Sequence, residues 1–164
     1  VGLAAELNLT GEIDIIMATF SKAAGSYGGF IISDNSICEY LINKCRGFIF
    51  STALPPATLG AANAAITLFC KEPDRREKLM MLIKYFHKSA AEKKLSILGA
   101  SQIIPVIIGD AEKTTEKADS LAARGYYVLP VRPPTVPVGS SRLRLSLNCF
   151  HTEKNIDELI QAIK

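Results

Sequence analysis

An uninterrupted apolar run that leads into a glycine-rich turn constrains the fold of this chain most. Ile15 to Ala18 form an apolar tetrad, and a run without polar alternation is typical of a strand buried on both faces of a parallel sheet. Gly25, Gly28 and Gly29 follow where the backbone must turn tightly or approach a ligand. The sequence therefore predicts an α/β fold with Lys22 placed between a buried strand and a tight turn.

The chemistry of Lys22 stays open when only spacing is considered, because a lysine after a strand is most often a solvated surface charge. The glycines form no P-loop, since no Gly-x-x-x-x-Gly-Lys-Ser/Thr pattern can be read. Thr19 and Ser21 nevertheless offer hydroxyls and amides that could hold an anion. An amine beside an anion-binding turn suggests a carbonyl-bearing, phosphorylated cofactor.

Composition and charge exclude several classes of function. The 164 residues are 48% hydrophobic, which is enough to bury a sizeable core in one domain or in parts of two. The net charge of +3 is small and dispersed, which argues against nucleic-acid binding. No apolar run approaches about 18 residues and no signal peptide opens the chain, so we expect a soluble cytoplasmic protein without a membrane span.

The cysteines fit that compartment. Cys38, Cys45, Cys70 and Cys149 form no Cys-x-x-Cys pair and lack the paired histidines of a zinc site. Cys38 and Cys45 would share one helix face at a separation of roughly 10 Å, which is too far for a disulfide. We therefore expect free thiols, buried or half-buried, and no metal site.

The pattern Thr-Phe-Ser-Lys-Ala-x-Gly-x-x-Gly-Gly at residues 19–29 resembles the lysine segment of the α-oxoamine synthases. These class II aminotransferase-like enzymes use pyridoxal 5'-phosphate to condense an amino acid with an acyl thioester. The resemblance implies that Lys22 is catalytic and binds the cofactor covalently, and that Thr19 is a cofactor-binding residue.

Ser51 and Thr52 precede a Leu-Pro-Pro sequence and a predicted helix. From the residues alone, simple capping of that helix is the alternative to a binding function. In the α-oxoamine synthases a Ser/Thr pair before Leu-Pro-Pro reaches across a dimer interface to the neighbour's cofactor phosphate. A phosphate at a helix start is physically reasonable, because free amides and the helix dipole point towards it. The resemblance thus implies cofactor binding by Ser51 and Thr52 in a homodimer with shared active sites.

The C-terminal part reads as a small α/β sandwich of the order strand, helix, strand, strand, helix. Its first strand runs over 103–108, where Pro105 argues for an edge position or a bulge. The following helix begins after Asp110, the next strand covers 126–131, and the last helix begins at Thr152.

The remaining strand, Arg142 to Leu147, alternates strictly between polar and apolar residues. Its leucines would share one face, while Arg142, Arg144 and Ser146 would share the other. Because a guanidinium can bind a planar carboxylate through two parallel hydrogen bonds, one of the arginines is a candidate for an amino-acid carboxylate. A surface or salt-bridge arginine is the alternative.

The loop at 132–139 narrows the resemblance to one branch of the α-oxoamine synthases. Its Arg-Pro-Pro-Thr-Val-Pro sequence, the Arg-Leu-Arg strand and the His-Thr before the last helix are similar to the branch that condenses L-alanine with a pimeloyl thioester in biotin synthesis. By that resemblance Thr135 and Arg144 bind substrate, Arg144 through the carboxylate, and Arg142 is structural. The glycine C-acetyltransferase and 5-aminolevulinate synthase types share the lysine segment but typically lack this loop, and they remain the alternative.

The resemblance also implies a domain organisation. The chain would be the C-terminal part of a fold-type I PLP-dependent transferase, with edge strands and helices of the large cofactor-binding domain over 1–71. A long connecting helix would follow over 72–94, and a small α/β domain over 95–164. The family's aspartate at the pyridine nitrogen and its histidine on the ring would lie outside this sequence. We therefore expect this chain to be an inactive acyltransferase fragment, or alternatively a non-catalytic module for binding or dimerisation.

Overall fold

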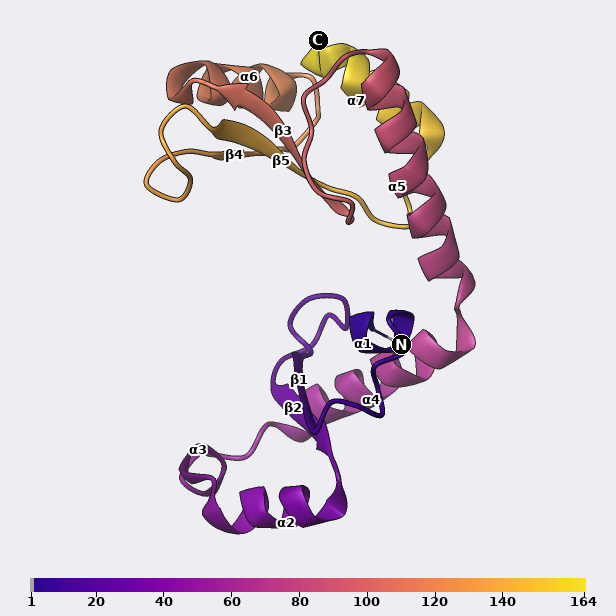
Figure 1. Ribbon diagram of the computed structural model, residues 1–164, viewed down its shortest axis with the longest axis vertical. Coiled ribbons are helices and arrows are strands. Elements are labelled where there is room, and N and C mark those ends of the chain that lie inside the picture. Colours follow the sequence, from indigo (N-terminus) through magenta and orange to yellow (C-terminus); the bar gives the residue numbers. More distant parts are fainter. Residues whose placement is uncertain (1) are drawn as a thin grey trace. The chain divides into compact units, whose positions relative to one another are not determined.

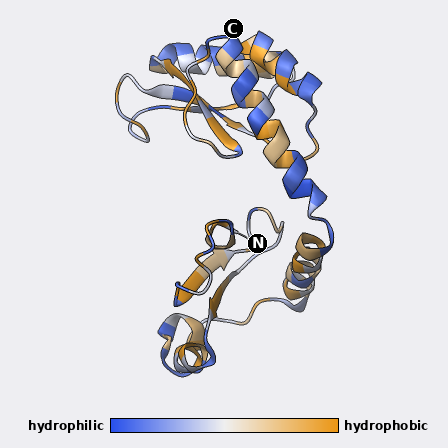
Figure 2. Ribbon diagram, turned by 45° about the vertical axis from the view of Figure 1, so that its right-hand side comes forward, coloured by the Kyte–Doolittle hydropathy of each residue, from blue (hydrophilic) through white to orange (hydrophobic). Residues whose placement is uncertain are grey.

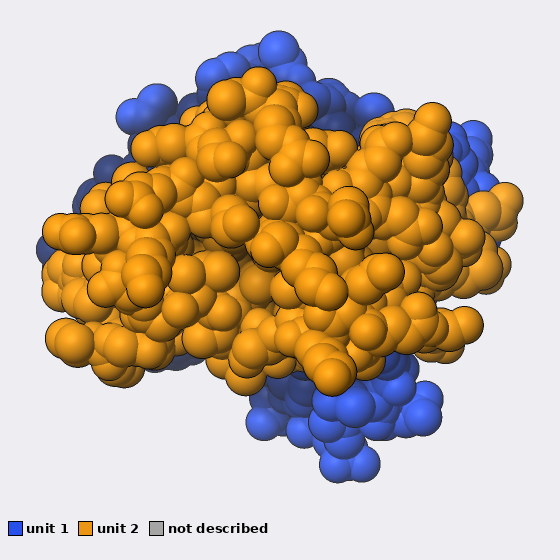
Figure 3. All heavy atoms as spheres, turned by 90° about the horizontal axis from the view of Figure 1, so that it is seen from above, with its two compact units in different colours: residues 1–73 blue, residues 74–164 orange. Residues whose placement is uncertain are grey.

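The computed structural model describes residues 2–164 and divides into two compact units. The first unit ends at Pro73 and the second comprises Asp74–Lys164 (Figures 1 and 3). The helix predicted over 72–94 to connect two domains belongs, by its contacts, to the second unit. Each unit is described by itself below.

The first unit contains a two-stranded antiparallel ribbon and four helices. Strands β1 (Ile15–Thr19) and β2 (Gly29–Ser33) pair along their whole length, with Thr19 opposite Gly29. Strand β2 leads directly into the helical part of the unit. The helices are α1 (Leu3–Glu6), α2 (Asn35–Lys44), α3 (Arg46–Ile49) and α4 (Pro56–Lys71).

The prediction that β1 is buried on both faces is wrong for the described chain. Ile15 is 48% exposed and Met17 is 70% exposed, although both strands are apolar along most of their length (Figure 2). The reason is physical: β2 is the only strand beside β1 in residues 2–164, and it runs antiparallel rather than parallel. Ala62 is the only buried hydrophobic residue of this unit in the described part of the chain. The first unit therefore has apolar surfaces but hardly any core.

The second unit forms the predicted small α/β sandwich. Strands β3 (Ile103–Gly109), β4 (Leu129–Val131) and β5 (Ser141–Ser146) make an antiparallel sheet in the order β3-β5-β4. The prediction of an edge position for Pro105 is confirmed, because β3 is an outer strand of this sheet. The helices are α5 (Asp74–Glu92), α6 (Ala111–Ala123) and α7 (Glu153–Ile163).

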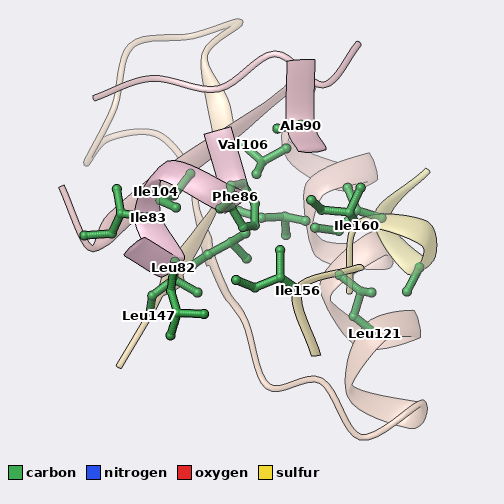
Figure 4. Packing of buried hydrophobic residues seen from close by; sticks show 14 of the residues in the cluster. Leu82, Ile83, Phe86, Ala90, Ile104, Val106, Leu121, Leu147, Ile156 and Ile160 are labelled. Carbon is green, nitrogen blue, oxygen red and sulfur yellow. The ribbon is translucent and has the colours of Figure 1, made fainter. Parts of the chain in front are cut away.

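The predicted alternation in residues 142–147, which include most of β5, is confirmed and places the leucines in the core. Leu143, Leu145 and Leu147 are 0%, 2% and 7% exposed, respectively. They pack with apolar side chains from α5, β3 and α7, and Phe86 of α5 lies fully buried in the middle of this cluster (Figure 4). The cluster also contains Leu82, Ile83, Ala90, Ile104, Val106, Ala118, Leu121, Ile156, Ile160, Ala162 and Ile163.

Helices α5 and α7 are also linked by a polar contact. The Tyr85 hydroxyl donates a hydrogen bond of 2.8 Å to Oδ2 of Asp157. This hydrogen bond is the main cause that raises the pKa of the Tyr85 phenol above its ordinary value. Thr152 begins α7 with a capping box, in which its hydroxyl accepts from the Asn155 amide and the Asn155 side chain accepts from the Thr152 amide.

Two further features concern the described chain as a whole. None of its helices between residues 2 and 164 combines the length and the apolar character that a membrane crossing requires. The four cysteines are free, and Cys70 is exposed, contrary to the expectation of burial, because α4 has little covering its surface.

We expect Phe86→Ala to destabilise the second unit by about 3–5 kcal/mol, because it removes a fully buried ring from the centre of the core. Hydrogen exchange of the β3 and β5 amides, which pair across the sheet, measures this change. The matched control is Val138→Ala, at a side chain that is 91% exposed, where a change within about 0.5 kcal/mol is expected. Equal protection in wild type and Phe86→Ala would contradict the assignment of this core.

Candidate active site

Lys22 lies in the loop that joins β1 to β2. The Phe20 amide donates to the Gly28 carbonyl at 2.9 Å, so the hairpin ladder continues by one bond beyond the strands. The Ser26 amide donates to the Phe20 carbonyl at 2.9 Å, and the Gly25 amide donates to the Lys22 carbonyl at 3.0 Å. These bonds fold residues 20–28 into a compact loop that presents Lys22 as an exposed side chain.

Four serine and threonine side chains, together with the phenol of Tyr27, line one cavity of about 720 Å³ in the first unit. Two of them, Thr19 and Ser21, flank the end of β1, with their hydroxyl oxygens 3.2 Å apart. The other two, Ser51 and Thr52, come from the segment before α4. The structure therefore brings together three of the predicted cofactor-binding residues, whereas Lys22 is not among the residues that line this cavity.

Gly28 explains why the two segments approach each other so closely. Its φ of +108° suits glycine, and a Cβ at this position would lie 2.6 Å from Cδ1 of Leu54. A second contact joins the same segments, because the Ser26 hydroxyl donates to the Thr58 carbonyl at 2.9 Å. The lysine loop is thus held against residues 51–58 by packing and by a hydrogen bond.

The structure does not support the helix-capping alternative for Ser51 and Thr52. The N-cap residue of α4 is Pro55, and no side chain caps that helix. The Ser51 hydroxyl instead donates to the Gly47 carbonyl in α3. Within residues 2–164 no hydrogen bond is described for the Thr52 hydroxyl, whereas the Ser51 hydroxyl has given its proton to Gly47 and offers a ligand only its acceptor lone pairs.

The chemistry of this cavity fits a phosphate group. Its lining combines the four hydroxyls with the backbone of Gly28, Gly29 and Gly47, and it contains no carboxylate that would repel an anion. A phosphorylated cofactor could therefore be held here by hydroxyl and amide donors alone.

The second unit contains the other predicted site residues. Thr135, Arg142 and Arg144 line one cavity of about 510 Å³ on the polar face of β5. Arg144 stands opposite Pro105 of β3 and Leu129 of β4 in the sheet register. The loop from β4 to β5, which carries Thr135, closes this side of the cavity.

The two arginines of β5 differ in their surroundings. Arg142 is half-buried, and its Nε donates to the Ser140 carbonyl at 2.9 Å. Arg144 is exposed, and no hydrogen bond is described for its guanidinium in residues 2–164. Arg144 is thus the one whose whole guanidinium remains available for a bidentate contact with a carboxylate.

The structure adds Arg132, which the sequence did not single out as a site residue and which lines the cavity of the second unit. Its position at the start of the Arg-Pro-Pro-Thr sequence was the available signal. Ser21, which the sequence suggested as an anion-binding residue, lines the cavity of the first unit.

Residues 2–163 match the family described as Aminotransferase class I and II, and the chain belongs to this family. Two curated relatives are named "Putative 8-amino-7-oxononanoate synthase" and "8-amino-7-oxononanoate synthase", respectively. That of Halalkalibacterium halodurans is 44% identical over 164 residues, which cover 99% of this chain and 42% of that protein. That of Gluconacetobacter diazotrophicus is 40% identical over 164 residues, which cover 99% of this chain and 40% of that protein. The predicted resemblance is confirmed.

Solved structures confirm the predicted fold class. A structure of SPT with a PLP internal aldimine superposes with a TM-score of 0.90 at 29% identity, covering 99% of this chain and 42% of that one. The 8-amino-7-oxononanoate synthase of Francisella tularensis gives a TM-score of 0.80 at 28% identity, covering 91% of this chain and 44% of that one. The chain spans about two fifths of the length of the curated relatives that it matches.

Proposed function

We propose that this chain serves an 8-amino-7-oxononanoate synthase, which condenses L-alanine with a pimeloyl thioester and releases carbon dioxide. The observation that carries the proposal is the cavity at which the Arg-Pro-Pro-Thr loop meets the two arginines of β5, in a chain whose relatives bear that name. The glycine C-acetyltransferase and 5-aminolevulinate synthase types find no comparable support.

Pyridoxal phosphate is the cofactor that we assign to the first unit. Thr19 would bind the phosphate of the cofactor held by its own chain, Ser51 and Thr52 would contact the phosphate of the neighbouring subunit's cofactor, and Lys22 would bind the carbonyl carbon covalently through Nζ. When bound, this cofactor supplies an electron-withdrawing ring that stabilises negative charge at the α-carbon of an amino acid.

Two side chains would act on the amino acid itself. The free amine of Lys22 would accept the proton from the α-carbon of L-alanine and later return a proton to the product, which is general base and acid work. Arg144 would hold the alanine carboxylate with two parallel hydrogen bonds, and Thr135 would contact the substrate from the β4–β5 loop.

We also propose that catalysis needs more polypeptide than this chain. The aligned part is about two fifths of the relatives' length, and the first unit buries almost none of its apolar residues. Both facts agree with an inactive acyltransferase fragment when the chain is alone.

A chimeric enzyme tests the function directly. Residues 1–164 replace the matching segment of the Gluconacetobacter diazotrophicus relative, and product formation from L-alanine and pimeloyl-CoA or pimeloyl-acyl carrier protein is followed by mass spectrometry. We expect the mass of 8-amino-7-oxononanoate. A folded, cofactor-bound chimera that makes no such product, or that prefers glycine with acetyl-CoA or succinyl-CoA, would refute the proposal.

The dimer prediction is tested by subunit mixing in the same chimera. If Ser51 and Thr52 bind the phosphate of the neighbouring subunit, a dimer of one Lys22→Ala subunit and one Thr52→Val subunit has one intact site. We expect recovery of part of the activity in the isolated heterodimer. A heterodimer as inactive as its two parent variants would show that each site is built from one chain.

A further inference from the structure

The cavity on the polar face of β5 carries more positive charge than one amino-acid carboxylate requires. Arg132, Arg142 and Arg144 all line it, and no aspartate or glutamate is among its lining residues. No ion pair is described for these arginines within residues 2–164. An anion with a single carboxylate would leave two of the three guanidinium groups without a counter-charge.

Apart from Thr135, the rest of the lining is apolar and lies beside the arginines. Pro105 and Leu129 are the register partners of Arg144, and Val131 is the β4 partner of Arg142. Ile103 and Pro130 complete this apolar strip. Since Arg142 and Arg144 are two residues apart on one strand, their Cα atoms are separated by about 7 Å, and the apolar residues lie beside them on the neighbouring strands. Two cations at this spacing with apolar side chains on both sides match an aliphatic dicarboxylate.

We propose that Arg142 forms a second carboxylate subsite, which binds the free distal carboxylate of the acyl donor while the methylene chain lies along Pro105, Leu129 and Val131. This inference rests on the proposed function, because the pimeloyl group is the acyl chain that ends in such a carboxylate. Arg142 is then a residue that determines acyl specificity and not only a structural partner.

Arg142 suits this task better than Arg132 for a geometric reason. The bond from its Nε to the Ser140 carbonyl fixes the guanidinium, and its half-buried side chain has little conformational freedom left to lose. That bond uses one of five N–H donors, so both terminal nitrogens can still bind a carboxylate. Arg132 is exposed in the β4–β5 loop, and only its backbone carbonyl has a described hydrogen bond, from the Thr135 amide at 3.0 Å.

Binding of simple carboxylates to the 164-residue chain tests the subsite without any turnover. Pimelate and heptanoate have the same number of carbons and differ in one carboxylate. We expect pimelate to bind at least about tenfold more tightly in a titration followed by amide chemical shifts of β4 and β5. The preference should shrink as the salt concentration rises, because the added contact is between charges. Equal affinities at low salt would overturn the proposal.

Matched variants assign the preference to one arginine. Arg142→Gln is expected to remove the preference for pimelate, Arg142→Lys to retain part of it, and Arg132→Gln to change it less than twofold. Amide spectra establish that each variant keeps the fold of the second unit. A larger loss in Arg132→Gln than in Arg142→Gln would refute the assignment, and if Arg142→Gln fails to fold, the comparison of pimelate with heptanoate in the wild type still decides.

These outcomes are independent of the test of function. A chimera that makes 8-amino-7-oxononanoate while the chain binds pimelate and heptanoate equally would refute only the subsite. A chimera without that product, in a chain that prefers pimelate, would refute only the proposed reaction.

Discussion

Replacing Lys22 with alanine is expected to abolish covalent attachment of pyridoxal phosphate and all measurable condensation in the chimeric enzyme. The reason is chemical, since the covalent bond needs a primary amine at this place and the same amine then moves the α-proton. The visible absorbance of the bound cofactor should disappear, and borohydride reduction should leave no added mass on the peptide that contains residue 22.

The matched control is Lys44→Ala, which removes an exposed lysine at the end of α2 in the same unit. This variant should keep the absorbance, the borohydride adduct and the activity. Two results would contradict the assignment of Lys22: a borohydride adduct of undiminished amount in Lys22→Ala, or a wild-type adduct located on a different lysine.

Replacing Arg144 with leucine is expected to weaken L-alanine binding to the chimeric enzyme about ten- to a hundredfold. A charge-assisted contact of this kind contributes about 1.5–3 kcal/mol, and about 1.4 kcal/mol corresponds to one factor of ten. The absorbance of the enzyme without alanine should stay nearly unchanged, because Lys22 and the cavity hydroxyls belong to the other unit.

Arg142→Leu is the matched comparison, two residues earlier on the same face of β5. It should change alanine affinity much less, since we propose that Arg144 and not Arg142 holds the alanine carboxylate. Alanine titrations of both variants, followed by the cofactor absorbance, give the answer. If the two variants lose alanine affinity equally, or if Arg142→Leu loses more, then Arg144 is not the specific contact of the alanine carboxylate.

The second unit could be predicted from sequence because its determinants are local. Alternation in residues 142–147 defines both faces of β5, and the polar residues Asp110 and Thr152 begin α6 and α7 as expected. The prediction of two arginines on one polar face required only the period of a strand.

The first unit could be predicted less well because its structure depends on neighbours. The apolar run at 15–18 correctly predicts a strand. The burial of that strand, however, depends on the elements that lie beside it, and β2 is the only strand that pairs with it in residues 2–164. The approach of residues 51–54 to the lysine loop depends on Leu54 filling the space above Gly28, which no period in the sequence encodes. Motif resemblance predicts that Ser51 and Thr52 bind a phosphate, which stays a prediction, whereas local capping rules would have assigned them to α4, which no side chain caps.

The uneven burial of the two units has a consequence for the chain in isolation. Exposed apolar residues on β1, β2 and α4 and the unpaired edges of the ribbon are features that promote association. We expect self-association through the first unit at high concentration, while the second unit keeps its native core.

The alternation in β5 also couples the packing of the core to the orientation of the arginines that line the cavity. Leu143 and Leu145 fix which residues of the strand face inward, so they also fix which residues face the cavity. A shift of the strand by a single position would move the leucines into the cavity and the arginines into the core. The hydrophobic core therefore fixes the position of the arginines that we propose to bind substrate. Mutations in β5 that preserve the charges but alter the spacing should be as damaging as loss of the charges themselves.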